Sequence, residues 1–133
     1  MANEVRFEDA SFTISIAPAH KMIIVDCRGF WDMATFARLE PEVESAMEAL
    51  IARGCSLGQE VVLIDTSEQV VQAQEVIARL AELTSVRWNT AKRMAVVVAS
   101  SLLKRQIGRI GPTHQIFDDR AKALHWLSDD TGQ

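Results

Sequence analysis

The chain has no tyrosine, only two cysteines and no long hydrophobic run. Two cysteines, Cys27 and Cys55, are too few for a disulfide framework, so we expect both to be reduced thiols. No apolar segment approaches the roughly 20 residues needed to span a bilayer, so no transmembrane segment is expected. The start, Met1 to Glu4, lacks the basic residues of a secretory signal. These absences together predict a cytoplasmic location.

The sequence also lacks the common motifs of catalysis and cofactor binding. It has no phosphate-binding loop of the Gly-x-x-x-x-Gly-Lys-Ser/Thr type and no Gly-x-Gly-x-x-Gly. The three histidines, His20, His114 and His125, are not spaced as metal ligands, and no signature brings one beside a cysteine. We therefore expect no metal, no cofactor and no catalytic residues, and we predict that the protein is not an enzyme.

Charge is unevenly distributed along the chain. The net charge is −4, yet the segment from Leu83 to Phe117 contains no acidic residue. Such a segment is suited to an acidic partner, a phosphate or a lipid head group, but a solvated face balanced by neighbouring acidic helices is the more common explanation. The overall acidity argues against a nucleic-acid partner. The basic residues of the segment are Arg87, Lys92, Arg93, Lys104, Arg105 and Arg109.

Five short apolar segments have the pattern of strands. The first alternates apolar and polar residues, as a half-buried strand does, and a turn of five residues joins it to the second as an antiparallel hairpin. The fourth is apolar on both faces and is expected at the centre of the sheet. The five segments are residues 12–16, 22–27, 61–64, 94–99 and 114–117.

Helical periodicity separates the later strands. Asp32 is a suitable N-cap for a helix that starts at Met33 and ends at Gly54. Pro41 lies inside this pattern, so either the helix kinks there or two helices meet. Three further helices are expected to begin at Ser67 or Glu68, at Ser100 or Ser101, and at Asp118 or Asp119.

The resulting order is β-β-α-β-α-β-α-β-α, within a single domain covering residues 1–133. Strands that are separated by helices pair in parallel through right-handed crossovers, and the hairpin adds one antiparallel strand. The sequence therefore predicts an α/β fold with a mixed five-stranded sheet and helices packed against it.

One strand ends in a cluster of polar residues. The apolar run 61–64 stops at Asp65, Thr66 and Ser67. Because ligands and partners bind at the carboxyl ends of parallel strands, this turn is a candidate site.

The order of elements and two stretches of sequence resemble the STAS domain of bacterial anti-anti-sigma factors and the wider SpoIIAA-like superfamily. The resemblance covers residues 12–127. One stretch is the basic lead into the fourth strand, Lys92 to Val97. The other is the close of the chain, where an acidic cap and a helix follow a short strand: Ile116, Phe117, Asp118 and Asp119, then Ala121, Ala123, Trp126 and Leu127.

The resemblance implies a regulatory position after the third strand. Anti-anti-sigma factors carry an Asp-Ser-Ser-Gly-like turn there, in which a serine is phosphorylated and partner binding is switched. The matching residues are Asp65, Thr66, Ser67 and Glu68, with Ser67 at the phosphoacceptor position. Glu68 departs from the pattern, because its charge opposes a phosphate beside it. The alternative is that Ser67 is simply a helix N-cap.

Aromatic and basic residues suggest a second kind of site. Aromatic side chains near strand ends can line an apolar pocket, and neighbouring basic groups can hold an anionic head group. Related folds in the superfamily hold lipids, but closure of the core over the helix ends is the simpler alternative. The residues concerned are Phe30, Trp31, Arg87, Trp88, Lys92 and Arg93.

Two functional hypotheses follow. The first is a non-enzymatic regulatory module of a bacterial protein, which resembles anti-anti-sigma STAS domains and binds a protein partner. The second is a carrier or sensor of a small apolar, lipid-like or amphipathic anionic ligand. A homodimer is compatible with either.

Overall fold

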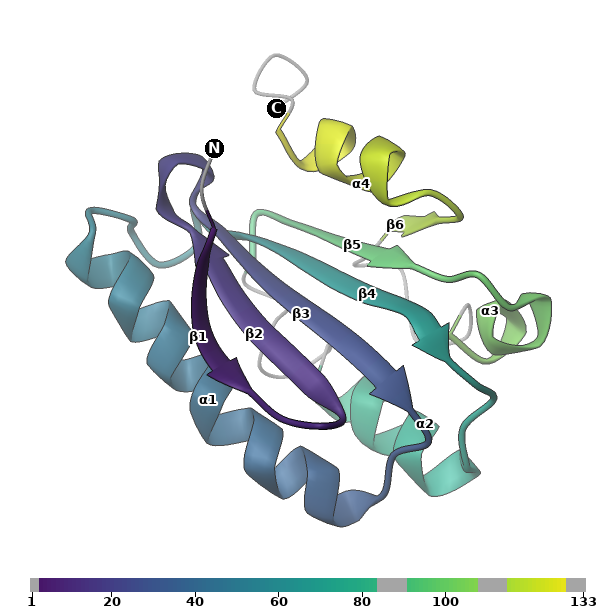
Figure 1. Cartoon of the computed structure of the whole chain (residues 1–133). Helices are drawn as coiled ribbons and strands as arrows, with labels where there is room; N and C mark the ends of the chain where they lie inside the picture. The colour runs from purple at the N-terminus through teal and green to yellow at the C-terminus, as the bar shows by residue number, and fades with distance from the viewer. Residues whose placement is uncertain (1–2, 84–90, 108–114, 129–133) are drawn as a thin grey trace.

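The computed structural model describes residues 3–83, 91–107 and 115–128, and these form one mixed sheet with helices on both faces (Figure 1). The sheet has six strands in the order β1-β2-β3-β4-β5-β6. Their bounds are β1 Glu4–Glu8, β2 Phe12–Ala17, β3 Met22–Gly29, β4 Val61–Gln69, β5 Arg93–Val97 and β6 Gln115–Phe117. The α/β class and the mixed sheet are thus confirmed, with one strand more than expected.

The additional strand is β1, at the edge of the sheet. It pairs antiparallel with β2, which in turn pairs antiparallel with β3 across the short 3-10 turn Pro18–His20. The expected hairpin is therefore present. The sequence pattern missed β1 because Val5 and Phe7 are its only apolar residues, and as an edge strand it needs no continuous apolar run.

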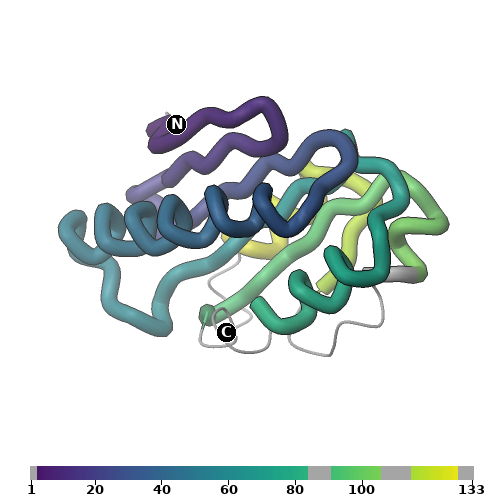
Figure 2. Tube along the Cα trace, turned by 90° about the horizontal axis from the view of Figure 1, so that it is seen from below, coloured from purple at the N-terminus to yellow at the C-terminus, as the bar shows by residue number. Residues whose placement is uncertain are grey.

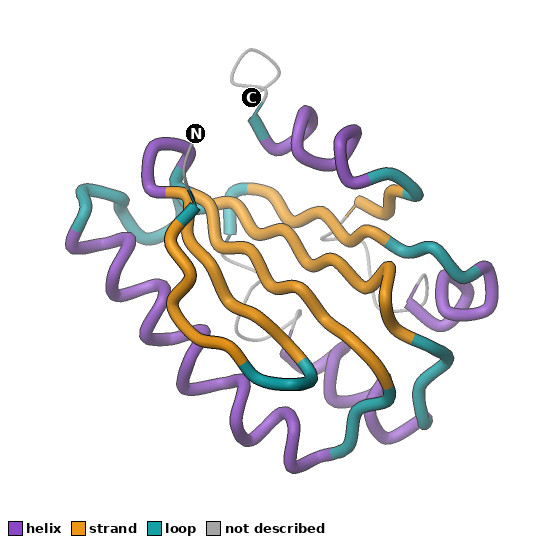
Figure 3. Tube along the Cα trace, viewed as in Figure 1, coloured by secondary structure: helices purple, strands orange, loops and turns teal. Residues whose placement is uncertain are grey.

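Strands β3, β4, β5 and β6 pair in parallel, so β5 lies inside the sheet as expected and β6 lies at its edge (Figure 3). The parallel pairs β3–β4 and β4–β5 form the centre of the sheet. Their side chains alternate between the two faces, and both faces are buried by helices.

Three helices cover one face and one covers the other. Residues of α1 (Met33–Ala52), α2 (Gln74–Glu82) and α3 (Ser101–Ile107) share a core with Val25 and Ile64. On the opposite face, α4 (Arg120–Leu127) packs through Leu127 onto Ile24 and Leu63. The trace in Figure 2 shows α1 running alongside the strands across much of the molecule.

The first helix is a single helix that continues through Pro41, which settles the two alternatives left by the sequence. Asp32 caps it by accepting a hydrogen bond from the Thr35 N–H at 3.0 Å. Asp119 caps α4 in the same way, through the Ala121 N–H at 3.0 Å. The Ser100 hydroxyl accepts from the Leu103 N–H at the start of α3.

The expected start of the second helix is wrong. Residues 67–69 extend β4 instead, and α2 begins only at Gln74, with no side chain capping it. The cause is the length of β3, because Arg28 pairs with Glu68 and Gly29 pairs with Gln69. Backbone pairing with a neighbouring strand thus overrides the local preference of Ser67 for a helix N-terminus, and Ser67 is not a helix cap.

Replacing Val97 with Asp tests the buried centre of the sheet. Val97 is buried and pairs in register with Asp65, so a new carboxylate there would be desolvated and repelled by a like charge. We expect a loss of about 4 kcal/mol in the free energy of unfolding, measured by chemical denaturation. Val5→Asp, at an exposed edge position, is the control and should change stability little. Unchanged stability in Val97→Asp would contradict this packing.

Candidate functional site

Asp65, in the middle of β4, is the centre of a charged cluster. Its Oδ1 accepts hydrogen bonds from the Ser67 hydroxyl at 2.6 Å and from the Ser67 N–H at 2.9 Å. Its Oδ2 accepts from Arg120 Nη1 at 2.6 Å, and the same nitrogen donates to Asp26 Oδ1 at 2.5 Å. Arg120, the first residue of α4, therefore joins carboxylates from two adjacent strands.

These contacts determine the ionisation of the cluster. Burial acts to raise the pKa of Asp65, but the hydrogen bonds from Ser67 and the bond and charge of Arg120 outweigh burial, so its pKa lies below the ordinary value of 3.8. Burial acts to lower the pKa of Arg120. The hydrogen bonds and charges of Asp26 and Asp65 outweigh burial, so the pKa of Arg120 lies above its ordinary value. Asp65 is therefore ionised at physiological pH, and it shares a single arginine with Asp26.

A bulge in β4 places the four residues of the candidate turn, Asp65 to Glu68, in different surroundings. Between the pairs Asp26–Asp65 and Arg28–Glu68, β3 has one residue and β4 has two, Thr66 and Ser67. Thr66 is buried on the α1–α2 side, where its hydroxyl donates to the Val97 carbonyl at 2.7 Å. Ser67 and Glu68 remain exposed.

A buried glutamine ties together the loops that follow β3 and β4. Gln72 Oε1 accepts from the Trp31 N–H at 2.8 Å, while Gln72 Nε2 donates to the carbonyls of Gly29 at 3.0 Å and Val70 at 2.6 Å. The side chain of Gln72 is 5% exposed. One amide thus satisfies backbone groups of both loops and holds the loops side by side.

We call these hydrogen bonds of Gln72 the Gln72 clasp. The two loops that it joins carry exposed apolar side chains, which we call the apolar edge: Phe30, Val70 and Val71. Their exposed fractions are 64%, 55% and 40%. Figure 1 shows that the loops after β3 and β4 emerge from the same end of the sheet. Exposed apolar residues also follow each of β3 and β5 at this end, namely Met33 and Leu102.

Trp31, the neighbour of Phe30, has the opposite environment. It is 3% exposed and makes edge-to-face contacts with Phe12 and Phe36. Its indole N–H donates to the carbonyls of Ser11 and Arg28. Trp31 therefore closes the core, as the simpler alternative supposed.

The residues expected to hold an anionic ligand are not brought together. Lys92 and Arg93 lie at the start of β5, whereas Phe30 follows the end of β3. Since Arg93 is level with Val61 and Met22, Phe30 is eight residues further along, or roughly 26 Å at 3.3 Å per residue. Arg93 donates to the Trp126 carbonyl and stacks on its ring at 5.3 Å. Arg87 and Trp88 lie outside the described residues.

The basic segment is divided in the same way. Lys92 and Arg93 lie at one end of β5, and Lys104 and Arg105 lie on α3, beyond its other end. Arg109 lies outside the described residues.

The two thiols are buried and free. Burial raises the pKa of Cys27, as does the charge of the nearby Asp26. Burial likewise raises the pKa of Cys55. Both thiols therefore resist ionisation. A nucleophilic cysteine, by contrast, has to ionise to the thiolate. Within residues 3–83, 91–107 and 115–128, no cluster of three His, Cys, Asp or Glu side chains is arranged to bind a metal ion, and no helix is long and apolar enough to span a membrane.

Sequence reasoning did not single out Asp26, Gln72 or Arg120. A signal for Asp26 was present, because two apolar strands each end in aspartate: residues 22–25 before Asp26 and residues 61–64 before Asp65. Parallel pairing then makes these aspartates neighbours. Nothing in the local sequence of Gln72 or Arg120 indicates their partners, which are distant in sequence.

Comparison with known proteins gives a fold. No family model and no curated protein matches the sequence. Among solved structures, the chain is similar to an uncharacterised protein of the DUF3478 family, with a SpoIIAA-like fold, from Shewanella loihica PV-4. The TM-score is 0.60 at 20% identity, covering 95% of this chain and 92% of that one. The chain therefore has the SpoIIAA-like α/β fold that its order of elements predicts.

Replacing Arg120 with Leu tests the charged cluster. The variant leaves the Asp65 carboxylate buried without its cation, so we expect the free energy of unfolding to fall by about 2 kcal/mol near neutral pH. Because the pKa of Asp65 is lowered in the folded state, this stabilisation is present above 3.8 and is lost as the pH falls through the folded value. The deficit of the variant should therefore shrink as the solution is acidified.

The measurement is denaturant unfolding of both proteins between neutral pH and about pH 2.5, a range that extends below the ordinary carboxyl pKa. Lys122→Leu is the matched control, because Lys122 lies on the same helix and its side chain is exposed. A deficit of equal size at every pH, or an equal one in Lys122→Leu, would contradict the role of the cluster.

Proposed function

We propose that this chain is a non-enzymatic regulatory module that binds a protein partner through the apolar edge. The observation that carries the proposal is the Gln72 clasp, which holds Phe30 beside Val70 and Val71 in an exposed position. A buried side chain that bonds to the backbone of two loops keeps the exposed surface in a fixed shape. A preformed surface of this kind reduces the entropy lost on binding.

The composition of the apolar edge suits a protein interface. Burying a large apolar side chain contributes about 1.5–3 kcal/mol, and aromatic residues at the centre of an interface often dominate its affinity. The exposed Asp32 and Glu68 flank the apolar edge in sequence and give it a polar rim. Small apolar centres with polar rims are typical of interfaces between proteins that also exist apart.

The charged cluster adjoins this surface through β4. Ser67 lies three residues before Val70, and its hydroxyl is bonded to Asp65. A phosphate on Ser67 would lie next to the carboxylates of Asp65 and Glu68, with no helix N-terminus to stabilise it. Arg120 is the cation in contact with Asp65. We therefore expect Ser67 to influence partner binding through charge, and expect its phosphorylation to be opposed.

The test for the partner compares variants of the apolar edge. The wild-type chain, Phe30→Ser and Val5→Ser are immobilised and exposed to a lysate of the encoding organism, and retained proteins are quantified. Val5 is the matched control, because it is 60% exposed but lies on the edge strand β1. We expect a protein retained by the wild type and by Val5→Ser, whose purified form binds Phe30→Ser about tenfold more weakly, a loss of about 1.4 kcal/mol.

Retention of the same proteins by all three chains would contradict the proposal. The oligomeric state of the purified chain is measured separately by sedimentation. A wild-type dimer that Phe30→Ser abolishes would make a second copy the occupant of this surface, and would equally contradict a distinct protein partner.

Ser67→Ala and Ser67→Asp test the regulatory position against the same partner. We expect Ser67→Ala to bind as the wild type does, and Ser67→Asp to bind several-fold more weakly, because it adds a third carboxylate beside Asp65 and Glu68. Affinity is measured by titration calorimetry, with melting temperature as the check on folding. Equal binding by both variants would reduce Ser67 to a structural hydrogen-bond donor.

A further inference from the structure

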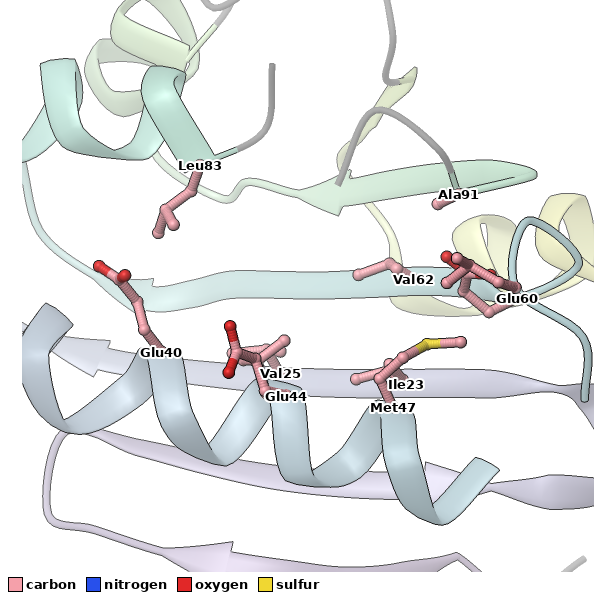
Figure 4. Close-up of a pocket in the computed structure, with 11 residues that line it drawn as sticks. Ile23, Val25, Glu40, Glu44, Met47, Glu60, Val62, Leu83 and Ala91 are labelled. Carbon is pink, nitrogen blue, oxygen red and sulfur yellow. The ribbon is translucent and has the colours of Figure 1, made fainter. Parts of the chain in front are cut away.

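A cavity of about 180 Å³ lies between α1 and the sheet, at the end of the molecule opposite the apolar edge. Its floor is apolar and comes from Ile23 and Val25 of β3 and Val62 of β4. Met47 of α1 and Leu83, just beyond α2, face this floor (Figure 4). By contrast, the space between the sheet, the first two turns of α1 and α2 is nearly filled, with about 20 Å³ left.

One buried carboxylate lines this cavity and forms no salt bridge with any of the described residues. Glu60 is 5% exposed, and its Oε1 accepts a hydrogen bond from the Gly58 N–H at 2.7 Å. Within the described part of the chain, its Oε2 has no hydrogen-bond donor and Glu60 forms no salt bridge. Burying an ionised carboxylate is costly unless it is paired, so a carboxylate retained here needs a reason.

Another carboxylate of the cavity shows the contrast. Glu40, on α1, is paired with Arg79 of α2, which also binds Glu82. Figure 4 shows Glu40 and Glu60 at opposite ends of the cavity, with the apolar floor between them. Glu44 of α1 also lines the cavity, between these two. Among the described residues, Glu40 thus has a cation partner and Glu60 has none.

We propose that the cavity binds a small primary amine, as its ammonium form, with a short apolar body. The ammonium group donates to Glu60 Oε2, and the apolar body lies on Ile23, Val25 and Val62. The cavity sets the size of the ligand, because an engineered cavity of about 150 Å³ holds benzene; a body of about six carbon atoms therefore fits. An anionic ligand is disfavoured, since its charge would meet Glu60.

This site is independent of the proposed protein interface, because it shares no residue with the apolar edge and lies at the opposite end of the strands. A failure of either proposal leaves the other standing.

The test uses three probes with the same six-carbon body and different head groups: hexylammonium, 1-hexanol and hexanoate. Binding is followed by the methyl NMR signals of Ile23, Val25, Val62 and Met47, which line the cavity. We expect hexylammonium to bind about tenfold more tightly than 1-hexanol, a difference of about 1.4 kcal/mol, and hexanoate to bind most weakly.

Variants distinguish the contribution of the Glu60 charge to binding from that of the cavity's free volume. Glu60→Gln keeps an acceptor for the Gly58 N–H and removes the charge, so hexylammonium should bind it no better than 1-hexanol does. Glu48→Gln, at an exposed position on α1 outside the lining of the cavity, is the control and should behave as the wild type. Met47→Trp fills the space and should abolish the binding of all three probes.

Four outcomes would overturn the proposal. They are no binding of any probe to the wild type, equal binding of ammonium and alcohol by the wild type, an unchanged preference in Glu60→Gln, and retained binding in a folded Met47→Trp. Melting curves of each variant establish that it is folded, so a loss of binding reports on the site.

Discussion

The parallel pairing of β3 with β4 is the interaction on which the rest of the structure depends. It runs from Met22–Val61 to Gly29–Gln69 and is interrupted by one bulge. At one end it forms the floor of the cavity, since Ile23 pairs with Val62. Further along it brings Asp26 beside Asp65, so that one arginine from α4 binds both. At its far end it brings the two loops within reach of Gln72. Each candidate site is therefore a consequence of this single register.

The same pairing separates two kinds of surface. The carboxyl end of the strands combines exposed apolar side chains with two aspartates that share one arginine, which suits reversible contact with a large partner. The cavity near the amino end combines an apolar floor with a buried carboxylate that has no salt bridge among the described residues, which suits a small cation. Because the two lie at opposite ends of stiff, hydrogen-bonded strands, occupation of one does not obstruct the other.

The candidate regulatory turn departs from the pattern that it resembles in two linked ways. Glu68 stands where a small glycine is expected, and it lies in a strand that continues to Gln69 where a helix is expected. A glycine favours the turn into a helix, whereas a residue with a side chain is compatible with extended pairing. The substitution and the longer strand therefore agree with one another. Ser67 keeps its exposed position, but its immediate neighbours are carboxylates and not a helix N-terminus.

Periodicity along the sequence determined the class of fold, the antiparallel hairpin, the interior position of residues 94–97 and the cap at Asp32, and it narrowed the cap of the last helix to Asp118 or Asp119. These features depend on local patterns: alternation in strands, three- and four-residue spacing in helices, and side chains that accept hydrogen bonds from their own first turn. Only the tertiary structure decided that β1 joins the sheet, that Ser67 belongs to a strand, that Trp31 is buried and Phe30 exposed, and that Arg93 is far from Phe30. The contacts of Asp26 with Arg120, of Trp31 with Gln72 and of the cavity wall join residues tens of positions apart. No local pattern encodes such contacts, because they depend on the register between strands that meet only after the chain has folded.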